Sequence, residues 1–304
     1  MATTAGELHE IQRRATRVER VVRPTTWPEA LEALIEHPDA RPVAGGTDLV
    51  LELARSSSPP VTLVDLSAIT TADEITETDG ALVLGGGVTH NQVVRDPRFR
   101  GLARPLAQAC LEIGSPQLRN RATIAGNLAT ASPANDTISA LMALDATVVL
   151  SHLAAGSVRE RQVPVREFFT GFRATVRRPE ELITEIHVPT LDVDDGVTSG
   201  VWAKLGLRRF QAISVVHLGL VLGVDGAGVI DRADLALGSI APTVVMSEVF
   251  RDAVVGGRVP IEPTRVAAIA DAVAASIEPI DDVRATAAYR RAVTATLVPR
   301  GCRC

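Results

Sequence analysis

Two glycine-bearing stretches constrain this chain more than any other feature. Residues 44–48, Ala-Gly-Gly-Thr-Asp, lie between a strand pattern and a helical pattern, and residues 123–137, TIAGNLATASPANDT, end where another helical pattern begins. Glycine lets a backbone approach a ligand closely, and free amides at a helix start attract phosphate. Alone, each stretch is more simply an ordinary turn with a helix cap, Asp136 being the candidate cap. Two such stretches in one domain favour a nucleotide that carries a diphosphate.

The composition supports a large aliphatic core and excludes some classes of partner. The 304 residues are 46% hydrophobic and 22% charged, which suits two domains or one large domain with a buried core. Aromatic residues make up only 3%, which disfavours a stacking platform for single-stranded nucleic acid. The net charge of −5 argues against a general binder of polyanions. We therefore expect no nucleic-acid partner.

The reactive side chains assemble into no familiar catalytic or metal motif. Cys110, Cys302 and Cys304 are odd in number and form no CxxC pair, and the terminal CxC is most simply part of a tail. The six histidines do not cluster at ligand spacing, and the chain has neither GxSxG nor HExxH. Neither glycine stretch is a P-loop or a dinucleotide GxGxxG. We assign no catalytic residue and no metal ligand.

The pattern along the chain predicts two domains after a polar arm at residues 1–20. The N-terminus has no secretory apolar segment, and the longest apolar run, 215–224, is half the length of a membrane helix, so we expect a cytoplasmic protein without a membrane span. Strands and helices mix up to a polar linker at 192–196, and strands followed by helices then indicate an α+β domain. The expected strands include 61–69, 80–89, 147–153 and 182–188, and the expected helices include 101–114, 138–146, 263–277 and 282–298.

Trp202 and Lys204 form one further pattern, on a strand expected near residue 203. Residues two apart on a strand project to the same face. An aromatic ring and a cation side by side suit a flat, electron-rich ring, although an ordinary half-buried strand explains the same spacing.

Four segments, in order, carry a resemblance to a known family. They are AGGTDL (44–49), TIAGNLATASPANDT (123–137), FFTGFRATVRRPEELITEIHVP (168–189) and KLGLRRFQAISVV (204–216). With these segments the chain resembles the FAD-binding (medium) subunits of molybdenum hydroxylases, which include xanthine, CO and aldehyde dehydrogenases. LALGSIAPT (235–243) and YRRAVTATLV (289–298) are similar to the C-terminal domain of that family.

The resemblance implies a fold and a cofactor. The fold class is α+β: residues 21–195 form a two-lobed vanillyl-alcohol-oxidase (PCMH)-type FAD-binding domain, split near residue 80. Residues 196–304 form a C-terminal α+β domain like that of the CO dehydrogenase flavoprotein. The implied cofactor contacts are Val43, Ala44, Gly45, Gly46, Thr47, Asp48 and Leu49 at the diphosphate, Thr123, Gly126, Asn127 and Asp136 in the second stretch, and Ile113, Ile183 and Lys204 elsewhere. We add Trp202 as a ring-side aromatic on our own inference.

One position departs from the family pattern. The family usually has TIGGN, and Ala125 stands here in place of the first glycine. If that position needs a positive φ, alanine costs roughly 1 kcal/mol, whereas at an ordinary φ alanine is tolerated. The chain also lacks the cysteine-bearing insert with which some CoA-reductase relatives bind an extra iron–sulfur cluster.

The resemblance implies an electron-transfer subunit that works with two partners. A large subunit would carry molybdopterin, a small subunit would carry two [2Fe–2S] clusters, and the complex would form a dimer of heterotrimers. Electrons would reach FAD and leave to NAD, oxygen, a quinone or a carrier. GTD in the first stretch, in place of the GHS of many CO dehydrogenases, favours the xanthine/aldehyde branch. The alternatives are a stand-alone FAD oxidase of the same fold and a scaffold that has lost FAD.

Overall fold

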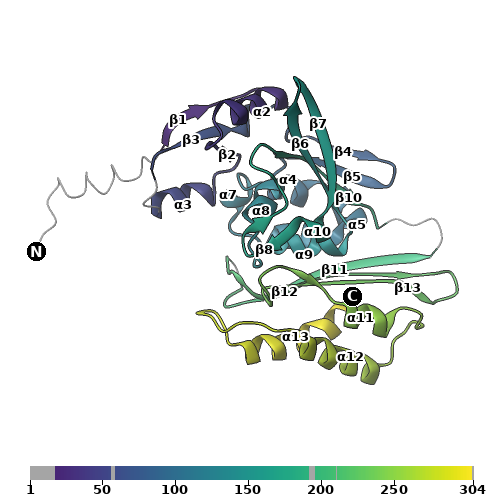
Figure 1. The fold of residues 1–304 in the computed structure, drawn as a ribbon. Coiled ribbons are helices and arrows are strands. Elements are labelled where there is room, and N and C mark those ends of the chain that lie inside the picture. Colours follow the sequence, from purple (N-terminus) through teal and green to yellow (C-terminus); the bar gives the residue numbers. More distant parts are fainter. Residues whose placement is uncertain (1–17, 56–58, 192–195, 210, 303–304) are drawn as a thin grey trace, which may run out of the picture.

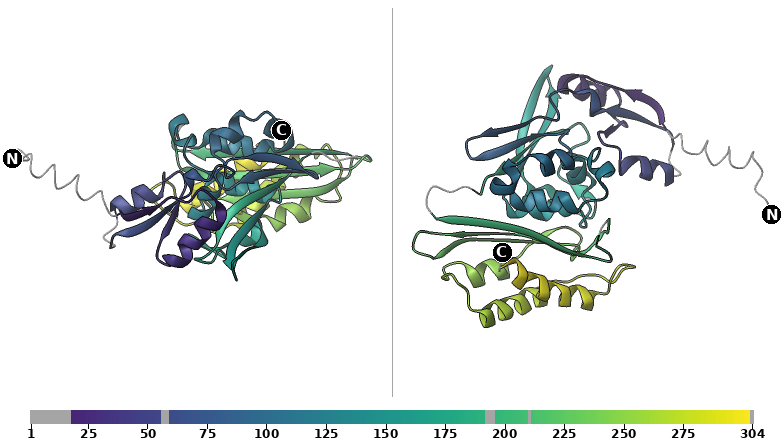
Figure 2. Two further views of the ribbon diagram at one scale, coloured as in Figure 1. Left: turned by 90° about the horizontal axis from the view of Figure 1, so that it is seen from above. Right: turned by 180° about the vertical axis from the view of Figure 1, so that it is seen from behind.

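The structure is a computed structural model that describes residues 18–55, 59–191, 196–209 and 211–302. Most of the expected N-terminal arm, the linker residues 192–195 and Cys304 lie outside the described residues. Figure 1 shows the described chain as stacked layers: two sheets at the top, a layer of helices beneath them, a third sheet, and a final layer of helices. The rear view in Figure 2 shows the same order.

The first lobe, at the N-terminal end of the described chain, contains a small parallel sheet in the order β1-β3-β2. Thr26 caps the helix beside it, with its side chain accepting from the Glu29 amide, and Pro28 lies in the first turn. The buried face of this helix packs on Val64 of the sheet and on Leu182 of the next lobe. Its elements are β1 (Val18–Val22), α2 (Trp27–Glu36), β2 (Arg41–Val43), α3 (Leu49–Arg55), β3 (Val61–Asp65) and the 3₁₀ turn η1 (Leu66–Ala68).

An antiparallel sheet in the order β4-β5-β10-β6-β7 forms the second lobe, and helices cover one of its faces (Figure 1). The aliphatic core between sheet and helices includes Phe99, Phe168 and Leu141. Its strands are β4 (Ile75–Thr78), β5 (Ala81–Gly85), β6 (Thr147–Ala154), β7 (Ser157–Pro164) and β10 (Leu182–Pro189), with the small hairpin β8 (Phe169–Gly171) and β9 (Ala174–Thr175). Its helices are α4 (His90–Arg95), α5 (Arg98–Leu102), α6 (Arg104–Glu112), α7 (Pro116–Arg119), α8 (Ile124–Thr130), α9 (Asp136–Ala143) and α10 (Val165–Phe168).

The C-terminal part is an antiparallel meander in the order β11-β12-β13-β14, followed by helices. Both faces of this sheet are buried: Val216, Leu218 and Leu220 pack toward the C-terminal helices, whereas Val221 packs toward the second lobe. This double burial explains the long apolar run, because a strand covered on both faces needs no polar alternation. The elements are β11 (Val197–Gly206), β12 (Ser214–Val224), β13 (Ile230–Gly238), β14 (Val245–Met246), α11 (Glu248–Val254), α12 (Pro263–Ser276) and α13 (Ala287–Gly301).

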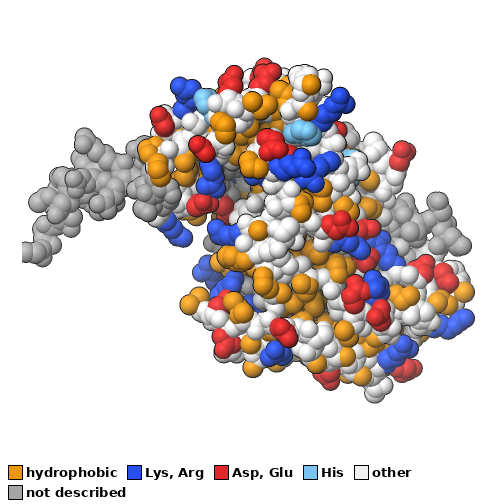
Figure 3. All heavy atoms as spheres, in the orientation of Figure 1, with side chains coloured by type: hydrophobic (Ala, Val, Ile, Leu, Met, Phe, Trp, Pro, Cys, Tyr) orange, Lys and Arg blue, Asp and Glu red, His pale blue; other side chains and the backbone are white. Residues whose placement is uncertain are grey.

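Several sequence expectations differ from the structure in detail. The helix expected over 101–114 is two helices, α5 and α6, that meet at Ala103, where the backbone leaves helical geometry. The helix expected from residue 282 begins at Ala287, because Thr286 caps it there. None of the helices in the described ranges is long and apolar enough to cross a bilayer. On the face shown in Figure 3, acidic and basic side chains lie interspersed.

Candidate functional site

The first glycine stretch is a tight turn between β2 and α3. Gly46 has φ +72, which favours glycine, and Gly45 lies so close to the second lobe that a Cβ there would be 2.0 Å from the Arg121 carbonyl oxygen. Within the described ranges, the amides of Gly45, Gly46, Thr47 and Asp48 find no hydrogen-bond acceptor. Donors left without a protein partner at a helix start can bind an anion.

The second stretch is not the turn expected from its composition, because its first half is the short helix α8. Thr123 caps this helix, and its Oγ1 accepts a hydrogen bond from the Gly126 amide at 3.0 Å. Ala125 is the second residue of α8, and its φ is not positive. Alanine therefore fits this position without backbone strain. The left-handed residue is instead Ala131, which ends the helix with φ 50.

The two stretches lie against each other although they are about 80 residues apart. Besides the contact of Gly45 with Arg121, the Thr130 hydroxyl donates to Asp48 Oδ2 at 3.2 Å. Figure 1 accordingly shows β2 and α3 beside α7 and α8. The first stretch thus packs against α8 and the residues just before it, so one ligand can contact both loops.

Asn127 connects α8 to the start of α9. Its side-chain Oδ1 accepts from the Thr137 hydroxyl at 2.5 Å, and its carbonyl accepts from Asn135 Nδ2 at 2.7 Å. The acceptor side of the Asn127 amide is therefore used within the protein.

Asp136 is the first residue of α9, and Asn135 occupies the cap position instead. One oxygen of Asp136 accepts from Lys204 Nζ at 2.8 Å, and the other accepts from the Ser214 hydroxyl at 2.5 Å. The side chains of Asp136 and Lys204 are each 7% exposed. Because Lys204 also donates to the Glu112 carbonyl at 3.0 Å, both charges are buried in a well-satisfied network.

Trp202 lies on the same face of β11 as Lys204, whose Nζ is 5.8 Å from the centre of the indole ring. The indole is buried, and its Nε1 donates to the Ser139 hydroxyl at 3.0 Å. The described contacts of Trp202 therefore join the C-terminal sheet to α9.

Ile113 and Ile183, the two apolar residues expected at the site, are both fixed by neighbours. The carbonyl of half-buried Ile113, at the end of α6, accepts from Arg119 Nη1 at 2.9 Å. Ile183 is buried in β10, and its carbonyl oxygen would be 2.2 Å from a Cβ at Gly86. The cations of Arg119 and Lys204 both meet carbonyls at the C-terminal end of α6, where the helix dipole favours positive charge.

Sequence reasoning missed the serines and histidines that support the site. Ser139, Ser214 and His217 are buried at the contact between α9 and the C-terminal sheet. His90 is buried beside Cys110, with 3.5 Å between Nδ1 and Sγ, and its amide donates to the Ala122 carbonyl at the base of the second stretch. Burial lowers the pKa of His90 to about 4. Only the alternation of small and apolar residues on these elements could have indicated burial.

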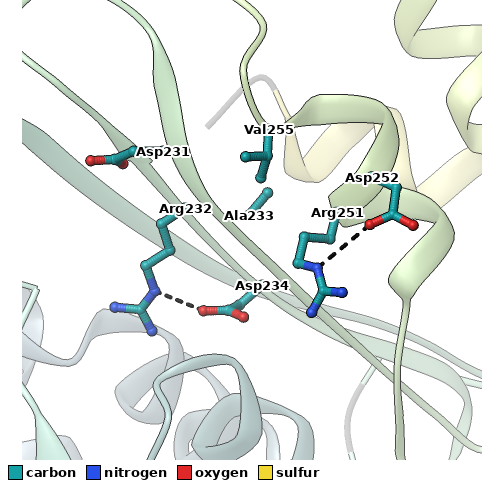
Figure 4. Close-up of a pocket in the computed structure, with 7 residues that line it drawn as sticks. All are labelled: Asp231, Arg232, Ala233, Asp234, Arg251, Asp252 and Val255. Carbon is teal, nitrogen blue, oxygen red and sulfur yellow. Dashed lines mark hydrogen bonds and ion pairs between the residues drawn. The ribbon is translucent and has the colours of Figure 1, made fainter.

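A separate surface hollow of about 470 Å³ lies between β13 and α11. Figure 4 shows two pairs among its charged side chains, Arg232 with Asp234 and Arg251 with Asp252. It contains no residue of either glycine stretch. Within the described chain, no three His, Cys, Asp or Glu side chains gather as a metal site requires.

Comparisons with known proteins match both parts of the chain. Residues 14–191 match the family described as the FAD binding domain in molybdopterin dehydrogenase, and residues 203–304 match the CO dehydrogenase flavoprotein C-terminal domain. The nicotinate dehydrogenase FAD-subunit of Eubacterium barkeri is 36% identical over 71% of this chain and 73% of its own length. The carbon monoxide dehydrogenase medium chain of Hydrogenophaga pseudoflava is 30% identical over 86% and 88%. A solved CO dehydrogenase structure from the same organism superposes with a TM-score of 0.85 at 28% identity, covering 94% of this chain and 96% of that chain.

Fold and matches together define an FAD-binding subunit of an oxidoreductase. The chain belongs to the family of molybdopterin-dehydrogenase FAD-binding domains, the flavoprotein subunits of molybdenum hydroxylases. The family and the α+β fold expected from the four motifs are therefore confirmed. So is the presence of an FAD-binding domain.

Proposed function

We propose that residues 43–49, with Thr123, Gly126 and Asn127, hold the diphosphate side of FAD. The observation that carries this proposal is that the amides of Gly45, Gly46, Thr47 and Asp48 have no acceptor among the described residues and lie in a loop packed against the segment before α8. Backbone donors and two adjacent helix starts suit an anion better than a neutral group. The exposed Gly126 offers close approach on the opposite loop.

We propose that the flavin ring lies toward the second lobe and the C-terminal sheet. Ile113 and Ile183 would supply apolar contacts, and Asp136, Lys204 and Trp202 would supply the polar and aromatic ones. Because Asp136 and Lys204 form a buried pair, their combined charge is near zero, so they act as fixed dipoles more than as a net charge. The residues of this chain bind and orient the cofactor, and we assign none of them a proton-transfer step.

When bound, FAD would supply both one-electron and two-electron redox chemistry, which suits a subunit placed between iron–sulfur clusters of a partner and an external acceptor. We propose that this chain is the medium subunit of a complex with a molybdopterin-bearing large subunit and a small subunit with two [2Fe–2S] clusters, assembled as a dimer of heterotrimers. The names of its relatives, an FAD-subunit and a medium chain, support this arrangement. The acceptor would be NAD, oxygen, a quinone or a carrier, and the complex would be cytoplasmic.

We propose that the FAD-binding domain ends at residue 195 and the C-terminal domain spans 196–304. For the division between the lobes we propose residues 66–74 in place of a split near 80. The reason is that β4 and β5, which flank the Asp79-Gly80 turn, belong to one sheet. The chain passes from the parallel sheet to the antiparallel sheet just before β4.

The first test is to purify the chain and identify any yellow cofactor by its visible spectrum and mass. We expect FAD, and a colourless chain that cannot be reconstituted with FAD would support the scaffold alternative.

A second test supplies NADH or small alcohols to the flavin-loaded chain alone. Sustained substrate turnover without partners would favour a stand-alone oxidase. Capture of the complex from its host should recover molybdenum and iron, and their absence would contradict the assignment.

A further inference from the structure

His217 is a buried histidine that the FAD-binding role does not explain. It lies in β12 with 0% of its surface exposed, on the face of the C-terminal sheet that meets α9. At this contact the two backbones nearly touch, because a Cβ at Gly219 would be 2.3 Å from the Ser139 carbonyl oxygen. A histidine at such a close contact needs specific partners, since an unpaired buried ring nitrogen is costly.

Both ring nitrogens of His217 have partners in the second lobe. Nε2 is 3.1 Å from the Pro133 carbonyl oxygen, and Nδ1 is 2.7 Å from the Ser139 hydroxyl oxygen. The carbonyl can only accept, so Nε2 carries the proton. Burial lowers the pKa of His217, so the ring is neutral, and the Ser139 hydroxyl donates to Nδ1 while it accepts from Trp202. The contacts thus select one tautomer and one ring orientation.

The space for this ring is made by a missing side chain on the next strand. A Cβ at Gly238 would be 2.0 Å from His217 Nε2 and 2.1 Å from Cε1. Gly238 has no positive φ, so its backbone alone does not require glycine. The close approach of the histidine does require it.

The carbonyl of Pro133, to which His217 donates, belongs to the second glycine stretch. The Pro133 carbonyl receives two donors from the C-terminal domain, His217 Nε2 and the Ser239 amide at 2.9 Å. Three residues further on, Asp136 accepts from Ser214 of the same domain. The segment between α8 and α9 is therefore fixed by hydrogen bonds across the domain contact.

We propose that His217 is a positioning residue: through Pro133 and Ser139 it sets the place of residues 133–136, and hence of Asp136, against the flavin site. This inference rests on the proposed FAD site. It identifies the C-terminal domain as part of the cofactor-binding machinery, acting through the second glycine stretch without touching the diphosphate loop.

The experiment compares three variants of the full chain, each titrated with FAD from the cofactor-free state and then studied with FAD bound: His217→Leu, His217→Gln and Ser139→Ala. His217→Leu removes both hydrogen bonds, whereas the glutamine amide of His217→Gln can donate to Pro133. We expect His217→Leu to raise the Kd for FAD about tenfold, as loss of a buried hydrogen bond implies, and to shift the flavin reduction potential and visible spectrum. His217→Gln should restore both to near wild type, and Ser139→Ala should lie between them.

The controls separate positioning from general stability. His37→Leu, in the first lobe, should leave the Kd, the potential and the spectrum unchanged. If His217→Leu does not fold, Ser139→Ala takes its place as the deciding variant. Wild-type affinity, potential and spectrum in the folded variants, whatever their melting temperatures, would overturn the proposal. If wild-type chain binds no FAD, the proposed function fails instead, which is a different result.

Discussion

The two glycine stretches contain similar residues but differ in whether their polar groups have partners within the protein. In the first, residues 44–48, the side chains are small and the amides of four residues have no acceptor within the described chain. In the second, residues 123–137, Thr123, Asn127 and Asp136 are all engaged in hydrogen bonds with the protein itself. The backbone donors of the first loop are available to a ligand, whereas the polar side chains of the second stretch are held by hydrogen bonds to neighbouring elements. A ligand at the second stretch would therefore meet side chains that already have protein partners.

The largest expected effect comes from breaking the buried ion pair between Lys204 and Asp136 of the second stretch. Lys204→Met leaves the Asp136 carboxylate buried without its counter-charge, which should cost about 3–5 kcal/mol of unfolding free energy. Urea unfolding measures this loss. Asp136→Asn combined with Lys204→Met removes both charges and should recover much of it. A loss below about 1 kcal/mol for Lys204→Met would show that the pair is not desolvated.

Acid should also destabilise the protein, because the buried imidazole of His90 lies beside Cys110 in the core under the second stretch. The pKa of His90 is lowered from 6.5 to about 4, so between these values the unfolded chain binds a proton that the folded chain does not. Stability therefore falls as pH falls from 6.5 to about 4, by roughly 3 kcal/mol for this group. The measurement is the unfolding free energy of wild type and His90→Gln across that range. The difference between the two proteins should change with pH, and parallel curves would contradict the buried neutral state.

The next expected effect comes from disturbing the close packing of the first loop against the second lobe. Gly45→Ala places a Cβ within 2.0 Å of the Arg121 carbonyl oxygen, so the loop must move away from α8. Overpacking of this kind costs about 1–3 kcal/mol, and we expect FAD affinity to fall at least tenfold in a binding titration. The matched control is Gly101→Ala in α5, where an added Cβ has no neighbour within 4 Å. That variant should bind FAD normally, and equal affinities for both variants would separate the first loop from the cofactor.

Sequence reasoning found the first loop more completely than the second. Strand, glycine turn and helix follow one another over residues 41–55, and each step has a local signal. Helix α8 has seven residues, including glycine and asparagine, which is too short for an apolar period to show. Strand β7 was missed because its first four residues are exposed and three of them, Ser157, Arg159 and Glu160, are charged or polar, as on an edge strand.

The network behind the second stretch was beyond local patterns for a different reason. Ser139 and His217 are 78 positions apart, and nothing in either segment names the other as its partner. The spacing of Trp202 and Lys204 correctly predicted one shared face. It did not indicate that this face meets α9, because sheet packing depends on the whole chain. The role of Trp202 beside the flavin stays a prediction.

The smallest expected effect concerns Ala125, where the family usually has glycine. Since Ala125 lies in the first turn of α8 without a positive φ, glycine offers no conformational advantage there. Ala125→Gly should lower the unfolding free energy by about 0.5–1 kcal/mol, the usual cost of glycine in a helix. Its Cβ is not required by the first loop, so FAD affinity should stay within about twofold in the same titration. A large gain in affinity would instead mean that the side chain of Ala125 obstructs the ligand.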